Sequence, residues 1–300
     1  MSYVDRLHAA VERAGNPCMV GIDPHPDRLP AEYAIVRDER APRSDRARAM
    51  GDFACELLDV AAGRVAVVKP QIAFFELFGA DGMREWERVV RTAREAGLLV
   101  LGDVKRGDIA STAAAYARAH LTGPAACDAI TINPYLGADS VEPFLEVCER
   151  ADAGLYLLVR TSNPGSADFQ RHGEPELSSV VAAAVARWGE RLLGAGGWSS
   201  VGAVIGATHP SELAGFRRAM PRTPFLLPGY GAQGGGVEGL RDAFPDGLLG
   251  GVINSSRGIA FAFDAPELAG RPWKDAASHA LERMIEEVTA ALSAPRRARR

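Results

Sequence analysis

Eight short apolar segments recur along this chain, and most are followed by an Ala-, Glu- and Arg-rich stretch of helical character. Such near-continuous apolar runs suit strands covered on both faces, and their alternation with helices predicts right-handed parallel crossovers. Eight such units match a single (β/α)8 barrel (TIM barrel) over residues 1–300 better than an open doubly wound sheet. The expected strands are Cys18–Asp23, Val65–Pro70, Leu98–Asp103, Ala129–Asn133, Leu155–Arg160, Val201–Gly206, Pro224–Leu227 and Gly251–Asn254.

Two stretches are longer than the minimal βα repeat requires. Residues 24–48 are rich in Pro, Arg and Asp, and residues 162–200 have Gly- and Pro-rich parts around a helical middle. We interpret both as insertions in βα connections. The basic tail, residues 295–300, is interpreted as a frayed terminus.

Composition narrows the classes of protein that remain. With 47% hydrophobic and 24% charged residues, the chain can bury a large core, which argues against disorder. The net charge of −4 leaves no broad cationic field for nucleic acid. Four widely spaced cysteines without a CxxC pair argue against a zinc site and a disulfide framework. No apolar run approaches the ~18 residues of a membrane span, so we expect a soluble, cytoplasmic protein without a membrane partner.

Polar and charged residues gather where the expected strands end, which is where barrels of this kind place their chemistry. Asp23 and Lys69 end the first two strands, and the third runs into DVKRGD, residues 103–108. Because side chains alternate along a strand, Asp103 and Lys105 should project to the same side. If Leu101 faces the barrel interior, both charges lie just above the packed core.

The last two strands lead into segments typical of a phosphate site. PGYGAQGGG, residues 228–236, offers glycines that let backbone amides approach an anion, and NSSRG, residues 254–258, offers a guanidinium beside a helix start. Gly229, Gly231 and Gly234 also satisfy GxGxxG. In a dinucleotide-binding fold, this fingerprint opens a βαβ unit and is followed by an acidic residue ~20 positions on. Here it follows the seventh expected strand and no such acidic residue is clear, so we disfavour a dinucleotide-binding fold.

Seven motifs in order resemble the orotidine 5′-phosphate decarboxylase family, in its longer bacterial branch (type 2). The Asp-x-Lys-x-x-Asp core alone is shared with related sugar-phosphate decarboxylases, and TSNPGS and PGYGAQGG make the match specific. The motifs are GIDP (21–24), VVKPQIAFFE (67–76), DVKRGDIASTAAAYA (103–117), TINPYLG (131–137), VRTSNPGS (159–166), PGYGAQGG (228–235) and NSSRGI (254–259).

The resemblance implies a carboxy-lyase that converts orotidine 5′-monophosphate to UMP and CO2 in de novo pyrimidine synthesis, without metal or organic cofactor. It implies a homodimer with shared active sites, in which Asp108 and Thr112 reach into the neighbouring subunit. Lys105 would donate a proton to C6 of the pyrimidine, with Asp103 near the departing carboxylate and Lys69 completing the charge network. Flanking carboxylates raise the pKa of a lysine and keep it an ammonium, which suits a proton donor.

The resemblance also implies how the substrate is held. Asp23 would bind the ribose hydroxyls, Ser162 would contact the pyrimidine, and Pro164 would form part of its apolar wall. The implied phosphate ligands are Gly231, Gln233 and Arg257.

Each of these residues also has a purely structural interpretation. Asp108 precedes a helical stretch and could be its N-cap. Asp103 and Lys105 could form a rim ion pair, Lys69 a solvated strand end, and Asp23 a turn. Ser162 and Pro164 lie in TSNPG, which has turn chemistry, and the loop glycines and Arg257 could serve ordinary turns and caps.

Two histidines, His25 and His209, lie at loop positions without a partner at metal-ligand spacing, and we interpret both as surface residues.

Two other activities remain open from the residues alone. A Schiff-base aldolase would need a lysine of depressed pKa, whereas DVKRGD supplies two carboxylates, although Arg106 adds ambiguity. A phosphometabolite-binding protein without catalysis is the other alternative, and the complete set of Asp103, Lys105, Asp108 and Lys69 disfavours it.

Overall fold

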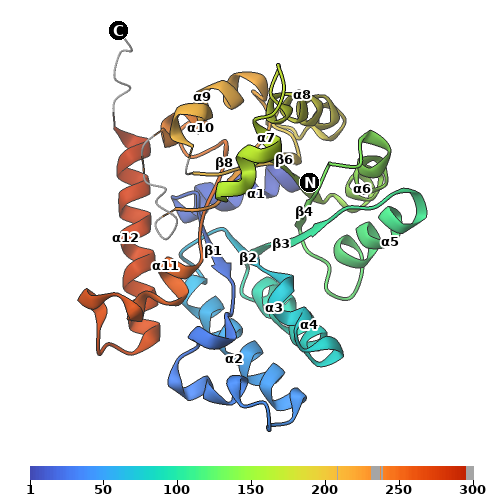
Figure 1. The fold of residues 1–300 in the computed structure, drawn as a ribbon. Helices are drawn as coiled ribbons and strands as arrows, with labels where there is room; N and C mark the ends of the chain where they lie inside the picture. Colours follow the sequence, from blue (N-terminus) through green and yellow to red (C-terminus); the bar gives the residue numbers. More distant parts are fainter. Residues whose placement is uncertain (208, 231–236, 238, 295–300) are drawn as a thin grey trace.

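Eight parallel strands close into a barrel in sequence order, which confirms the predicted (β/α)8 fold (Figure 1). The structure is a computed structural model that describes residues 1–207, 209–230, 237 and 239–294. Every predicted strand is present, with bounds that differ by one to three residues. The strands are β1 (Cys18–Ile22), β2 (Val67–Pro70), β3 (Leu99–Arg106), β4 (Ala129–Ile132), β5 (Gly154–Arg160), β6 (Val201–Ile205), β7 (Phe225–Leu227) and β8 (Gly251–Ser255).

Helices surround the barrel and cover the outer faces of its strands (Figure 1). The α-helices are α1 (Tyr3–Ala14), α2 (Arg43–Ala61), α3 (Ile72–Glu76), α4 (Gly79–Glu95), α5 (Ala110–Leu121), α6 (Ala138–Ala151), α7 (Ala167–Gln170), α8 (Leu177–Gly189), α9 (Pro210–Ala219), α10 (Leu240–Ala243), α11 (Arg257–Ala260) and α12 (Trp273–Ser293). The 3-10 helices are η1 (Pro26–Arg28), η2 (Ala31–Arg37), η3 (Pro164–Ser166), η4 (Glu190–Leu192), η5 (Ala262–Asp264) and η6 (Pro266–Leu268).

The barrel interior is a separate apolar cluster that α1 closes from the amino-terminal end of the strands. Leu101 belongs to this cluster, as predicted, together with inward-facing residues of other strands such as Val67 and Val252. Tyr3 and Leu7 of α1 pack against them, and each is 1% exposed. Because α1 fills this end, the carboxyl ends of the strands are left as the open rim.

The two long stretches have different contents. Residues 24–48 form η1, η2 and the start of α2, and they contact the carboxyl-terminal part of the chain. Arg28 forms an ion pair with Asp264 at 2.7 Å, and Trp273 Nε1 donates to Glu32 Oε1 at 2.5 Å. Residues 162–200 include α8, the helix that the βα repeat itself requires, so only η3, α7, η4 and their connections are additional. The tail 295–300 lies outside the described residues.

Over the residues that the structure describes, no helix is long and apolar enough to cross a membrane. The same residues contain no group of three or more His, Cys, Asp or Glu side chains able to hold a metal ion. The four cysteines are free thiols.

Candidate active site

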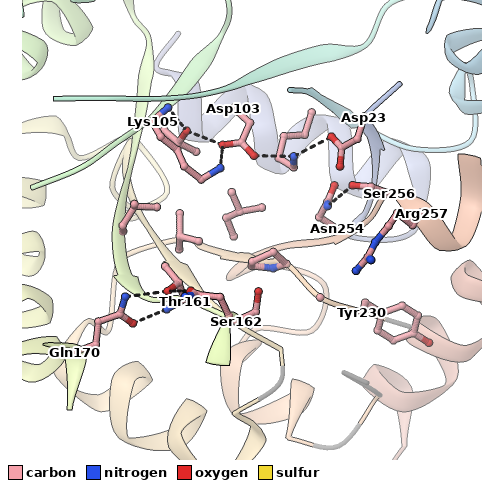
Figure 2. Close-up of a pocket in the computed structure, with 18 residues that line it drawn as sticks. Asp23, Asp103, Lys105, Thr161, Ser162, Gln170, Tyr230, Asn254, Ser256 and Arg257 are labelled. Carbon is pink, nitrogen blue, oxygen red and sulfur yellow. Dashed lines mark hydrogen bonds and ion pairs between the residues drawn. The ribbon is translucent and has the colours of Figure 1, made fainter. Parts of the chain in front are cut away.

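A cavity of about 420 Å³ opens at the carboxyl ends of the strands. Polar side chains on its wall come from β2, β3, β4 and β8 and from the segments that follow β1, β5, β7 and β8 (Figure 2). Leu158, Val204 and Leu226 supply apolar surface. A concave cavity in which polar groups converge beside apolar surface is typical of a small-molecule site.

Four charged side chains form a row of alternating sign along one side of this cavity (Figure 2). Lys105 Nζ lies 2.6 Å from Asp103 Oδ1, and Lys69 Nζ lies 2.9 Å from Asp103 Oδ2. Lys69 Nζ also lies 3.7 Å from Asp23 Oδ1. Lys69 is 4% exposed and Asp103 is 6% exposed, which excludes a solvated strand end for Lys69.

Burial and neighbouring charges shift the pKa values of Asp103 and Lys69 in opposite directions. Burial by itself would raise the pKa of Asp103, but the ammonium groups of Lys69 and Lys105 outweigh it and hold that pKa well below its usual range. Burial would likewise lower the pKa of Lys69, but the carboxylates of Asp103 and Asp23 outweigh it and raise that pKa. Asp103 is therefore a carboxylate and Lys69 an ammonium at neutral pH.

A β-bulge, not regular alternation, directs Lys105 into the cavity. The register between β3 and β4 shifts between Gly102 and Arg106, and Lys105 has φ of 43°, in the left-handed region that non-glycine residues rarely adopt. Thr131 of β4 stabilises this geometry, because its Oγ1 accepts from the backbone amides of Val104 at 3.1 Å and Lys105 at 3.0 Å. The same hydroxyl donates to Asp103 Oδ1 at 2.9 Å.

Thr131 and Gln71 are site residues that sequence reasoning missed. Gln71 Nε2 donates to Asp103 Oδ2 at 3.0 Å, so Asp103 has neutral donors as well as two ammonium partners. Both residues lie at strand ends within the family motifs. Gln71 follows Lys69 by two positions, so the alternation of side chains along a strand predicts that both project to the same side. That spacing could have identified Gln71.

Several other residues of the cavity wall had no individual role predicted, although Tyr230 and Asn254 lie in the two segments predicted to form a phosphate site. Asn254 Nδ2 donates to Ser256 Oγ at 3.1 Å, and Tyr230 donates from its hydroxyl to Glu287 Oε2 at 2.6 Å. Gln170 comes from α7, within the long stretch after β5, where no sequence pattern pointed to it.

The other predicted site residues, the catalytic Asp108 and the substrate-binding set, divide into three groups. Asp23, Ser162 and Arg257 line the cavity, and Arg257 lies on the same side as Tyr230, away from Lys105 (Figure 2). Pro164, Thr112 and Asp108 are not among its lining residues. Gly231 and Gln233 lie outside the described residues.

Asp108 lies in an exposed segment before α5. Its Oδ1 accepts from the adjacent backbone amide of Ile109 at 2.8 Å, and no ion pair joins it to Lys105 within the described chain. The N-cap of α5 is Ile109, so the N-cap interpretation of Asp108 is wrong.

Both loop histidines are half-buried, so the surface interpretation is wrong for them. His25 packs against Phe74 and Phe261, with ring centroids 4.3 and 5.9 Å away. The His209 ring nitrogen Nε2 lies 3.1 Å from the backbone carbonyl oxygen of Thr161. Aromatic packing therefore explains the position of the His25 ring, and one contact with a backbone carbonyl explains that of the His209 ring.

Fold and site together define an α/β-barrel enzyme with its active site at the carboxyl ends of the strands. Residues 18–271 match the model of the orotidine 5′-phosphate decarboxylase / HUMPS family. The chain belongs to this family, which confirms the resemblance inferred from the seven motifs.

Known proteins support the same assignment over nearly the whole chain. The chain is 42% identical to an orotidine 5′-phosphate decarboxylase of Rhodopirellula baltica over 301 residues, covering 96% of this chain and 99% of that protein. A Clostridium novyi protein of the same name is 37% identical, covering 95% and 98%. The solved structure of Leishmania donovani OMP decarboxylase is 33% identical with a TM-score of 0.76, covering 98% and 100%. The expected enzyme class, a carboxy-lyase, is thereby confirmed.

Proposed function

We propose that this chain converts orotidine 5′-monophosphate to UMP and CO2 without a cofactor, with Lys105 as the proton donor. One observation carries the proposal: the Lys105 ammonium lies 2.6 Å from a buried carboxylate, on the wall of a cavity that Arg257 also lines. The names of the relatives support the same substrate.

The chemistry needs stabilised negative charge and a proton at one carbon. When the bond between C6 and the carboxylate breaks, its electron pair stays on C6 and CO2 leaves. A preorganised ammonium stabilises that charge as it develops. Lys105 then transfers a proton to C6 and recovers one from solvent, so the balance needs no oxidant or reductant. Asp103 holds the ammonium in place and is itself kept ionised by Lys69.

The proposal also assigns a residue to each part of the substrate. Arg257 binds the phosphate, Asp23 the ribose and Ser162 the pyrimidine, and all three line one cavity. Its volume of about 420 Å³ is in the usual range for a small-molecule site, roughly 300–1,000 Å³. Gly231 and Gln233 join the phosphate ligands in this proposal, and Pro164 joins the wall around the pyrimidine.

We further propose a homodimer in which Asp108 and Thr112 complete the partner's site. The segment of Asp108 and the segment that follows β4 both expose large apolar side chains: Ile109 is 53% exposed, Tyr135 78% and Leu136 51%. The backbone amide of Asn133 donates to the carbonyl oxygen of Arg106 at 2.8 Å, so the two segments that carry these side chains adjoin. Clustered apolar side chains of this kind favour a protein interface. A cytoplasmic location stays a prediction.

The deciding experiment follows the loss of orotidine 5′-monophosphate absorbance in metal-free buffer with EDTA. We expect the wild type to turn the nucleotide over and Lys105→Ala to lose turnover by several orders of magnitude, because Lys69, the other ammonium on Asp103, is buried between Asp103 and Asp23 and does not replace Lys105. UMP binding to the variant serves as the control for an intact site. A folded wild type that leaves the nucleotide unchanged would overturn the proposal and favour related sugar-phosphate chemistry or binding alone.

A further inference from the structure

Thr161, immediately after β5, has every polar group engaged in a hydrogen bond. Its backbone amide donates to Gln170 Oε1 at 2.8 Å, and Gln170 Nε2 donates to Thr161 Oγ1 at 2.8 Å. Its hydroxyl donates to Asn163 Oδ1 at 2.6 Å, and its carbonyl oxygen lies 3.1 Å from His209 Nε2. Four such contacts from three residues fix this position of the chain.

Ser162, the next residue, has the opposite character. Its hydroxyl makes no hydrogen bond within the described part of the chain, and it lines the cavity (Figure 2). Its backbone packs against Gly206, where an added Cβ would lie 2.9 Å from Ser162 Cα and 3.0 Å from its Cβ. A glycine at 206 is therefore needed for this close approach. Thr161, which is fixed by hydrogen bonds, thus precedes Ser162, whose hydroxyl is available to hydrogen-bond to a ligand.

We infer that Gln170 is a positioning residue: by clamping Thr161 it holds the Ser162 hydroxyl where the pyrimidine of the substrate must lie. This inference rests on the proposed function, since Ser162 acts on the pyrimidine only if the nucleotide binds there. Gln170 lines the cavity, but both its amide oxygen and its amide nitrogen bond to Thr161, so its hydrogen bonds in the structure act on that residue.

The location of Gln170 explains why the clamp is needed. It ends α7, a helix of four residues that is too short to be stable alone. Its neighbour Phe169 is 69% exposed and adds little packing. Two connections tie α7 to the end of β5: Arg160 Nη1 donates to the hydroxyl of Ser166, the N-cap of α7, at 2.6 Å, and Gln170, at the other end of the helix, makes its two hydrogen bonds with Thr161. Groups that orient a reacting partner must be held within a fraction of an ångström, and a misplacement of 1 Å can cost about a hundredfold in rate.

A double-mutant cycle tests this inference with kcat/KM for orotidine 5′-monophosphate. Gln170→Ala and Ser162→Ala should each lower kcat/KM by about tenfold to a hundredfold. The double variant should be no worse than Ser162→Ala alone by more than about twofold, since Gln170 acts through Ser162. Gln170→Glu should recover part of the loss, because it keeps the acceptor for the Thr161 amide. Phe169→Ala, on the same helix, is the matched control and should behave as the wild type.

Hydrogen exchange of the peptide that contains Thr161 measures the clamp without substrate. Gln170→Ala should speed this exchange, whereas Phe169→Ala should not. Unchanged exchange, or losses of kcat/KM that multiply in the double variant, would overturn the inference while leaving decarboxylation by the wild type intact. A wild type without turnover would instead overturn the proposed function, and the inference with it.

Discussion

At the scale of single residues, the charged motif DVKRGD predicted the right groups but not all of their partners. A sequence of alternating charges places Lys105 between Asp103 and Asp108, whereas among the described residues Lys105 forms an ion pair with Asp103 and none with Asp108. The second ammonium on Asp103 comes from Lys69, 34 positions earlier. The two ammonium partners of Asp103 therefore come from two different strands, and the spacing of residues within one motif cannot predict such a pairing.

His120 is a buried titratable group that should make stability depend on pH. Burial, together with the positive charge of Arg106, lowers its pKa to about 4, with Glu76 acting in the opposite direction. Because the folded pKa lies below the unfolded value, the unfolded chain binds the extra proton first. The contribution of His120 to the free energy of unfolding is therefore fully present above about pH 6.5 and is lost as the pH falls towards 4, by about 3 kcal/mol in total.

Urea unfolding between pH 7.5 and pH 4.5 measures this contribution. His120→Leu should remove it, so that the wild type loses free energy of unfolding relative to the variant as the pH falls. Parallel pH profiles for the two proteins would contradict the assignment to His120.

At the scale of elements, the apolar runs predicted all eight strands, but not the irregularity that matters most in β3. Strand alternation correctly predicted that the Asp103 and Lys105 side chains project to the same side of β3. Lys105 reaches that side, however, through a β-bulge in which its backbone has a left-handed conformation. The pairing of β3 with Thr131 of β4 stabilises that bulge. Such a feature depends on the neighbouring strand, so the sequence of β3 alone cannot indicate it.

Thr131→Val tests the link between the bulge and the site. Valine keeps the shape of the side chain but leaves two backbone amides and one oxygen of Asp103 without this partner. We expect a stability loss of about 1–3 kcal/mol. We also expect kcat to fall by about tenfold with little change in KM, since the lost contact orients Lys105 and not the substrate.

Thermal unfolding and steady-state kinetics on Thr131→Val and Thr131→Ser check both effects. Thr131→Ser retains the hydroxyl and should recover most of kcat. A Thr131→Val enzyme with wild-type kcat would show that the bulge does not depend on this hydroxyl.

At the scale of the whole molecule, the proposed catalytic set is distributed between the cavity and an exposed rim. Lys69, Asp103 and Lys105 meet in the cavity, whereas Asp108 and Thr112 lie outside it beside exposed apolar side chains. One copy of the chain therefore brings together only part of the predicted set. A second copy seated on this rim would bring in the rest, as a closed two-fold dimer does reciprocally.

Mixing two inactive variants tests the shared site. In a heterodimer of Lys105→Ala and Asp108→Ala subunits, one site carries both defects and the other carries neither. Random mixing should therefore restore about a quarter of the wild-type activity, since half of the dimers are mixed and each has one intact site. Each variant alone is the control. Verified heterodimers that stay inactive would place Asp108 in its own subunit's site or outside catalysis.

The sequence by itself determined the barrel, the order of its strands and the rim at which the charges gather. These follow from local properties, because apolar periodicity sets each strand and parallel strands end at one edge. The tertiary structure alone decided which groups meet. Thr131 lies 28 positions from Asp103, and the register between β3 and β4 brings them together. Gln170 reaches Thr161 only because a non-repeating segment folds back on β5. Such contacts depend on the packing of distant segments, which local patterns do not encode.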